Sequence, residues 1–245
     1  MTNIIQSKHP VLKSIGIAFI PVFAAIISGT IISIKKLDDL QSILVQTLLF
    51  SISIILGLVL IRKSKIHYTD VGLNSFPKYV NKKLLYWVPL ILIEATTFIV
   101  GFKDKSIVWI LALLPFVICV GVNQELYFRG IVLNILKKLG NRKAIIISAM
   151  LFGVLHSANL LAGKEPIFVF EQVIFALVFG VVAAEIVIIT KSLLPVIIWH
   201  VLHDFIGFIT NDCISNTALI ILTFQIIVLI LFSIFLWKKL SIKIQ

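Results

Sequence analysis

Three short segments of the chain combine ionisable side chains with apolar neighbours in a pattern suited to chemistry. Glu125 and Arg129 stand four residues apart in the first segment, and His156 ends the second. His200 and Asp204 stand four residues apart in the third. Residues with this spacing lie on one face of a helix. A carboxylate and two imidazoles in a partly dry cavity could activate a water molecule and stabilise an oxyanion, because a low dielectric strengthens both interactions.

The same side chains could instead bind a metal. Two histidines and one glutamate with an open position form a known catalytic zinc set. The chain has no H-E-x-x-H motif, and ligands spread over three segments have no diagnostic spacing. The sequence therefore leaves two alternatives open at Glu125, His156 and His200: a water activated by the glutamate, which requires no cofactor, or a bound zinc ion.

These charges lie in a chain that is otherwise strongly apolar. Hydrophobic residues make up 60% of its 245 residues and charged residues 13%. A soluble globular protein carries roughly 25% charged residues, so this class is excluded. A charged side chain at bilayer depth costs several kcal/mol unless it is paired or faces a wet cavity. Glu125 and Arg129 therefore indicate a functional site.

The apolar residues form eight stretches that are long enough, or nearly so, to cross a hydrocarbon core of about 30 Å. Runs of this length without two-residue alternation predict helices. No linker or repeat divides the chain, which predicts one all-α polytopic membrane domain over residues 1–245. The predicted spans are residues 11–34, 40–61, 84–102, 106–130, 144–160, 167–190, 193–210 and 217–237.

Basic residues are distributed unevenly between the two sides that eight spans would create. Sixteen lysines and arginines fall on the side of both termini and five on the other, and Arg129 lies within a span. The positive-inside rule then predicts an integral plasma membrane protein with both termini cytoplasmic. This asymmetry accounts for the net charge of +11 without a nucleic-acid partner. The basic loops are expected to face anionic lipid headgroups.

The three segments are predicted to meet at one depth. Measured from the nearest basic residue on the cytoplasmic side at 1.5 Å per residue, Glu125 lies about 18 Å deep, His156 about 20 Å and His200 about 14 Å. Three helices would therefore bring a glutamate and two histidines to nearly one level, which predicts a single site.

Other polar side chains near these residues are given supporting roles or none. Asp204 is predicted to orient His200 by accepting a hydrogen bond from its ring. Arg129 pairs with the glutamate of its own segment. His203 either supports the site or packs against a carbonyl group, and both alternatives stay open. Glu94 is isolated in its span and receives no role.

In their order and spacing the three segments resemble the CAAX prenyl protease and bacteriocin-processing family of intramembrane endopeptidases, also called the Abi family. The resemblance covers roughly residues 106–210. One such motif would be weak evidence, whereas three in order are fairly specific. The matched positions are Gln124 to Gly130 for E-E-x-x-x-R-G, Phe152 and His156 for F-x-x-x-H, and His200 and Asp204 for H-x-x-x-N or H-x-x-x-D.

The resemblance implies proteolysis within the membrane. It implies an eight-span fold with a cavity open toward the cytoplasm, in which a peptide or lipid-modified protein tail is cleaved. A prenylated tail and a bacteriocin-like peptide are the expected substrates. In the family, the first glutamate of E-E-x-x-x-R is assigned as the base that activates water, helped by the histidine of the second motif. The histidine and the Asn or Asp of the third motif stabilise the oxyanion.

The chain departs from the family motif at position 124, where glutamine replaces the first glutamate. A carboxamide cannot take up a proton at neutral pH. Either Glu125 acts as the base, with Gln124 orienting water or substrate, or the chain is a non-catalytic member that acts as a membrane immunity or regulatory binding protein. We predict the first. The predicted catalytic residues are Glu125, His156, His200 and Asp204, and the predicted supporting residues are Gln124, Arg129, Phe152 and His203.

Overall fold

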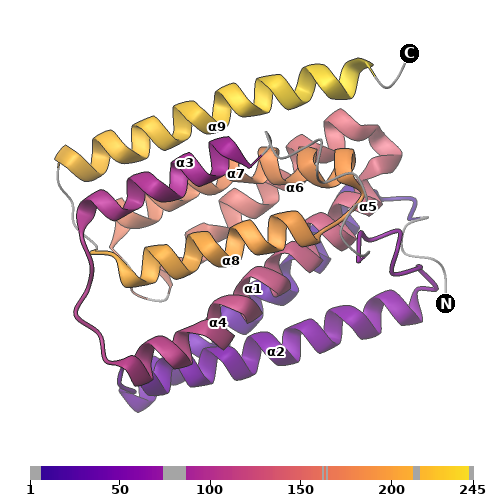
Figure 1. The fold of residues 1–245 in the computed structure, drawn as a ribbon. Coiled ribbons are helices and arrows are strands. Elements are labelled where there is room, and N and C mark those ends of the chain that lie inside the picture. The colour runs from indigo at the N-terminus through magenta and orange to yellow at the C-terminus, as the bar shows by residue number, and fades with distance from the viewer. Residues whose placement is uncertain (1–6, 74–86, 162, 164, 212–215, 243–245) are drawn as a thin grey trace.

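The computed structural model describes the chain apart from residues 1–6, 74–86, 162, 164, 212–215 and 243–245. The described part is a bundle of helices, in which one isolated bridge pairs Phe102 with Thr210 (Figure 1). The elements are α1 Pro10–Lys35, α2 Asp39–Lys63, α3 Val88–Thr97, η4 Phe98–Val100, α4 Ile107–Glu125, η5 Leu126–Val132, α5 Leu133–Leu136, η6 Lys137–Leu139, α6 Asn141–Leu155, η7 His156–Leu160, α7 Pro166–Thr190, α8 Leu194–Ile209 and α9 Asn216–Ile242.

The predicted all-α membrane fold is confirmed. Six described helical segments are long and apolar enough to cross a membrane, one of them running from α4 through η6. The predicted spans 84–102 and 193–210 correspond to two shorter apolar helices, Val88–Val100 and Leu194–Ile209. At 1.5 Å per residue the second of these is about 24 Å long, shorter than the hydrocarbon core. Length and composition therefore support six full spans, and eight stays a prediction.

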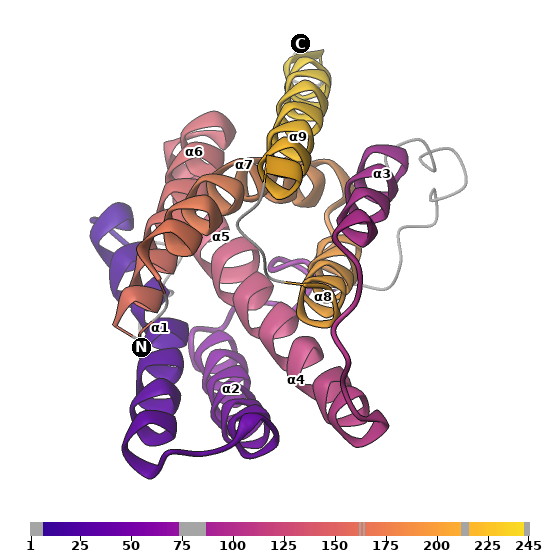
Figure 2. The same ribbon diagram turned by 90° about the vertical axis from the view of Figure 1, so that its left-hand side faces the viewer.

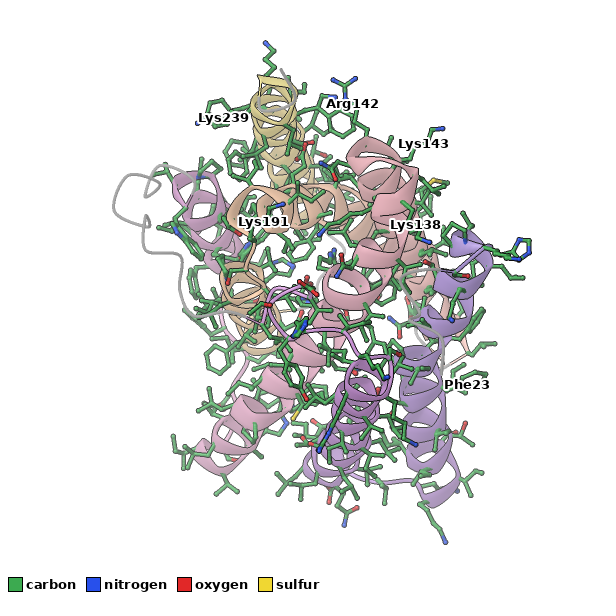
Figure 3. The ribbon with its side chains drawn as sticks, turned by 90° about the vertical axis from the view of Figure 1, so that its right-hand side faces the viewer. Phe23, Lys138, Arg142, Lys143, Lys191 and Lys239 are labelled. Carbon is green, nitrogen blue, oxygen red and sulfur yellow. The ribbon has the colours of Figure 1, made fainter. Side chains whose placement is uncertain are left out.

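The bundle has two distinct ends. Both termini lie at one end, together with the turns that precede α6 and α8, and the α3–α4 connection lies at the other (Figure 1). Figure 3 views the end with the termini, where Lys138, Arg142, Lys143, Lys191 and Lys239 gather. We call it the basic end. Figure 2 views the opposite end, which carries the α1–α2 and α3–α4 connections.

Local signals fix the starts of the two helices that carry the first and third motifs. The Ser106 hydroxyl accepts a hydrogen bond from the backbone N–H of Trp109 at 3.2 Å and so caps α4. At the start of α8, the Leu193 N–H donates to the carbonyl of Gly72 at 2.8 Å. Gly72 has φ of 81°, a conformation that glycine adopts at little cost. The segment after α2 thereby anchors α8 at the basic end.

Glycines allow α6 and α7 to approach closely. A Cβ on Gly153 would lie 3.0 Å from the backbone nitrogen of Leu177, and one on Gly180 would lie 3.0 Å from the Cα of Ala149. Close approach of this kind is how helices gain packing energy inside a bilayer, where no hydrophobic effect drives them together.

Gly153→Ala is therefore expected to destabilise the protein by about 1–3 kcal/mol, because the backbone of α7 must move away. Gly16→Ala is the matched control, since Gly16 is exposed on α1 and a Cβ there would meet nothing within 4 Å. Its effect should be neutral or stabilising by up to about 1 kcal/mol. Thermal unfolding of the two variants in detergent measures both effects, and an equal effect of the two substitutions would contradict the close packing of α6 and α7.

Candidate functional site

The first motif lies where the helix of α4 changes its winding. α4 ends at Glu125 and continues directly as η5, a π-helical stretch whose seven residues are all buried. Such stretches are rare and frequently occur at functional sites. The Ser148 hydroxyl of α6 donates to the carbonyl of Phe128 at 2.9 Å. A side chain from a neighbouring helix thus satisfies a backbone group of the altered stretch.

Glu125 and Arg129 form a fully buried ion pair. Arg129 Nη1 lies 3.0 Å from Glu125 Oε1, and neither side chain is exposed. The guanidinium lies over the ring of Phe152, with its Cζ 3.9 Å from the ring centroid. The cation is therefore held by a carboxylate and an aromatic face. Removing either member of the ion pair would leave an uncompensated charge in an apolar interior.

His200 makes the second contact with the same carboxylate. Its Nδ1 lies 2.7 Å from Glu125 Oε1. An ionised carboxylate can only accept hydrogen bonds, so Nδ1 carries the proton and donates. In the neutral ring the lone pair is then on Nε2, and Asp204 Oδ2 lies 3.7 Å from this nitrogen. The side chain that orients His200 is thus Glu125 rather than Asp204, which faces the other ring nitrogen.

His156 is fixed by the backbone of its own helix. Its Nδ1 lies 2.7 Å from the carbonyl oxygen of Phe152, which can only accept a hydrogen bond. The Phe152 ring packs edge-on against both imidazoles, at 4.6 Å between centroids for His156 and 6.0 Å for His200. Phe152 therefore connects the second motif with the third.

A cavity of about 490 Å³ adjoins these groups. Among the predicted site residues, Gln124, Phe152, His156, His200 and Asp204 line it. Residues of α1 and α2, which carry no motif, form another part of its wall. These residues are Pro21, Val22, Ala25, Ser28, Gly29, Ile32, Ser33, Ser42, Gln46 and Phe50.

The adjacent residues Gln124 and Glu125 have different surroundings. Gln124 lines the cavity, and its amide oxygen is buried with no hydrogen-bond partner among the described residues. Glu125 is absent from the lining and fully buried in its contacts with Arg129 and His200. The cavity wall therefore carries a carboxamide at the position where the family motif has its first glutamate.

The proposed zinc set does not fit this arrangement. The described residues contain no group of three or more His, Cys, Asp or Glu side chains that could hold a metal ion. Glu125 Oε1 is already engaged by Arg129 and His200, and His156 directs Nδ1 at a carbonyl.

A second polar cluster joins α3 to α8. It includes Glu94, for which the sequence predicted no role. Glu94 of α3 accepts a hydrogen bond from Trp199 Nε1 at 2.9 Å and lies 3.2 Å from His203 Nδ1. His203 therefore joins Glu94 and does not reach the cavity lining. Trp199 stacks on Phe179 at 4.2 Å, and Phe179 also packs edge-on against His200 at 5.1 Å. The cluster fixes α8 against α3 and α7.

One feature of the amino-acid sequence could have predicted this cluster. A lone glutamate in an apolar span requires a partner, and Trp199 and His203 share one face of their helix. The α1 and α2 residues of the cavity wall give no such signal, because they are small, apolar or uncharged.

Residues 106–206 match the model of the family described as type II CAAX prenyl endopeptidase Rce1-like. The match confirms the resemblance predicted from the three motifs and covers about two fifths of the chain. It runs from the cap of α4 into α8, so all three motifs lie within it. No curated protein and no solved structure matches the chain significantly.

Proposed function

We propose that this chain, whose residues 106–206 carry an Rce1-like type II CAAX prenyl endopeptidase domain, is an intramembrane peptidase that cleaves a peptide segment held in the cavity. The observation that carries the proposal is the environment of His200. Its Nδ1 is held at 2.7 Å by a buried carboxylate, and the residue lines the cavity beside Asp204. A histidine oriented in this way by a carboxylate is suited to general base catalysis.

His200 is the base in this proposal. Its Nε2 takes a proton from water as the water oxygen bonds to the peptide carbonyl carbon. Glu125 stabilises the imidazolium that forms, and its ion pair with Arg129 holds Glu125 in place. As the C–N bond breaks, the imidazolium returns the proton to the departing amine. Glu125 is assigned as the orienting group and not as the base predicted from the sequence, because it does not line the cavity.

The other residues of the wall position the reactants. Asp204 lies 3.7 Å from His200 Nε2, so a water hydrogen-bonded to both would be held beside the base. The Gln124 carboxamide has two N–H donors and can stabilise the oxyanion of the tetrahedral intermediate. His156 brings a second imidazole to the same wall, where its Nε2 can bind the substrate amide.

A second candidate function is peptide binding without cleavage, as in an immunity or regulatory protein. Gln124 favours it, because the family motif has at this position the glutamate that is assigned as the base. In this alternative the cavity holds the same kind of segment and the buried ion pair is purely structural.

Restoring the family residue separates the two functions. Wild type and Gln124→Glu are reconstituted in proteoliposomes with fluorogenic peptides, with and without a farnesylated C-terminal cysteine. The peptidase proposal expects wild type to cleave. Gln124→Glu should then lower the rate, because a carboxylate at this position can only accept hydrogen bonds and no longer stabilises the oxyanion.

The binding alternative expects a different pattern. Wild type would bind a peptide without cleaving it, and Gln124→Glu would either gain cleavage or remain inert. Binding is measured by fluorescence anisotropy of the same peptides. An inert wild type that binds peptide would overturn the peptidase proposal.

A further inference from the structure

The cavity occupies the half of the bundle near the opposite end. Its lining comes from the second half of α1 and the first part of α2, and it reaches Ser33 and Ser42 on either side of the α1–α2 turn. From α8 it takes residues from His200 to Phe208, near the end of that helix. Ser33 is exposed. The mouth therefore lies at the end viewed in Figure 2, away from both termini.

The cavity is closed in the direction of the basic end. Phe128 and Phe152 line it there and are only 3% and 2% exposed. Behind them lies the buried pair of Glu125 and Arg129. No lysine or arginine is among the lining residues.

The two ends of the bundle differ sharply in charge. At the opposite end the described residues carry equal numbers of basic and acidic side chains: Lys35, Lys36, Lys103 and Lys105 with Asp38, Asp39, Asp104 and Glu165. At the basic end the described charged residues are overwhelmingly positive: Lys8, Lys13, Arg62, Lys63, Lys65, Lys137, Lys138, Arg142, Lys143, Lys191, Lys238 and Lys239, with the acidic Asp70 (Figure 3). This difference is seen in the folded bundle and does not depend on a count of spans.

From these observations we infer that the cavity opens on the extracytoplasmic face of the membrane. The positive-inside rule assigns the basic end to the cytoplasm, and the mouth lies at the other end. Cytoplasmic termini and a cavity open toward the cytoplasm were both predicted from the sequence, and the structure makes them incompatible. The charge distribution supports the prediction of cytoplasmic termini, so the cavity mouth is assigned to the opposite face of the membrane. The inference rests on the proposed function only in naming the occupant as a substrate.

The occupant is an extended peptide segment without acidic side chains that is presented from outside, such as an exported peptide or the outer juxtamembrane part of a membrane protein. The outer part of the wall combines apolar residues with uncharged polar groups from Ser28, Ser33, Ser42 and Gln46. These groups can pair with peptide N–H and C=O groups. No lysine or arginine in the lining would neutralise an acidic side chain of the peptide. A prenylated cytosolic tail would approach from the wrong side.

Cysteine labelling in intact cells tests the orientation without requiring activity. In a background with Cys119→Ser and Cys213→Ser, three single variants are made: Ser33→Cys at the mouth, Gln46→Cys inside the cavity, and Lys143→Cys at the basic end. A membrane-impermeant maleimide should label the first two variants in intact cells. Lys143→Cys should be labelled only after permeabilisation. An uncharged peptide that is cleaved or bound should protect Gln46→Cys and leave Lys143→Cys unprotected.

The reverse pattern, with Lys143→Cys labelled in intact cells, would overturn the inference. Labelling of Ser33→Cys without Gln46→Cys would also overturn it, because the cavity would then not be reached from that end. Failure of the peptidase proposal looks different: the labelling pattern persists while no peptide is cleaved.

Discussion

His200→Ala is expected to lower the rate of peptide cleavage by about 10²- to 10⁴-fold, the usual contribution of a general base, while peptide binding is retained. The substitution removes the nitrogen that takes the proton from water and leaves the α1 and α2 walls unchanged. Single-turnover cleavage in proteoliposomes measures the rate, and anisotropy of a labelled peptide measures binding.

His67→Ala is the matched control for this prediction, because His67 is exposed and lies outside the cavity lining. It should cleave at the wild-type rate. A His200→Ala protein that folds, binds peptide and cleaves as fast as wild type would remove the base from the proposed mechanism.

Neutralising one member of the buried ion pair is expected to have the largest effect on stability. Glu125→Gln or Arg129→Gln alone should cost about 3–5 kcal/mol, because the remaining charge is left unpaired in an apolar interior. The double variant should be less destabilised than the sum of the two, since it buries no net charge. Unfolding of the four proteins in one detergent completes the double-mutant cycle.

Lys105→Gln is the control for this cycle. Lys105 pairs with Asp39 at 2.7 Å, and the Asp39 side chain is 73% exposed. Loss of such a surface pair should cost no more than about 1 kcal/mol. Equal effects of Lys105→Gln and Glu125→Gln, or strict additivity between Glu125→Gln and Arg129→Gln, would contradict a buried coupled pair.

The level at which the site residues meet could be predicted from the sequence, because helical rise converts residue number into depth. Glu125 and His200 were placed at similar depths, and their side chains are in contact at 2.7 Å. The spacing of Glu125 and Arg129 likewise predicted an ion pair, which the structure contains. The lengths of the apolar stretches in the sequence correctly predicted the long helices.

The direction in which each side chain points could not be predicted. Consecutive helical residues differ by about 100° around the axis, so Gln124 and Glu125 face different surroundings at the same depth. Which of them faces the cavity depends on the packing of α4 against α2 and α8 and on the π-helical stretch that follows. Glu94 was missed because its partners on α8 lie more than one hundred residues away.

Isotope transfer from water tests most directly whether His200 activates a water molecule in the cavity. Wild type and His200→Ala in proteoliposomes are given a peptide that both bind, in water enriched in ¹⁸O, and the products are analysed by mass spectrometry. The proposed mechanism expects wild type to release a fragment whose new carboxyl group contains one ¹⁸O atom, and His200→Ala to release almost none. Intact peptide recovered from both proteins, or equal ¹⁸O incorporation by both, would contradict it.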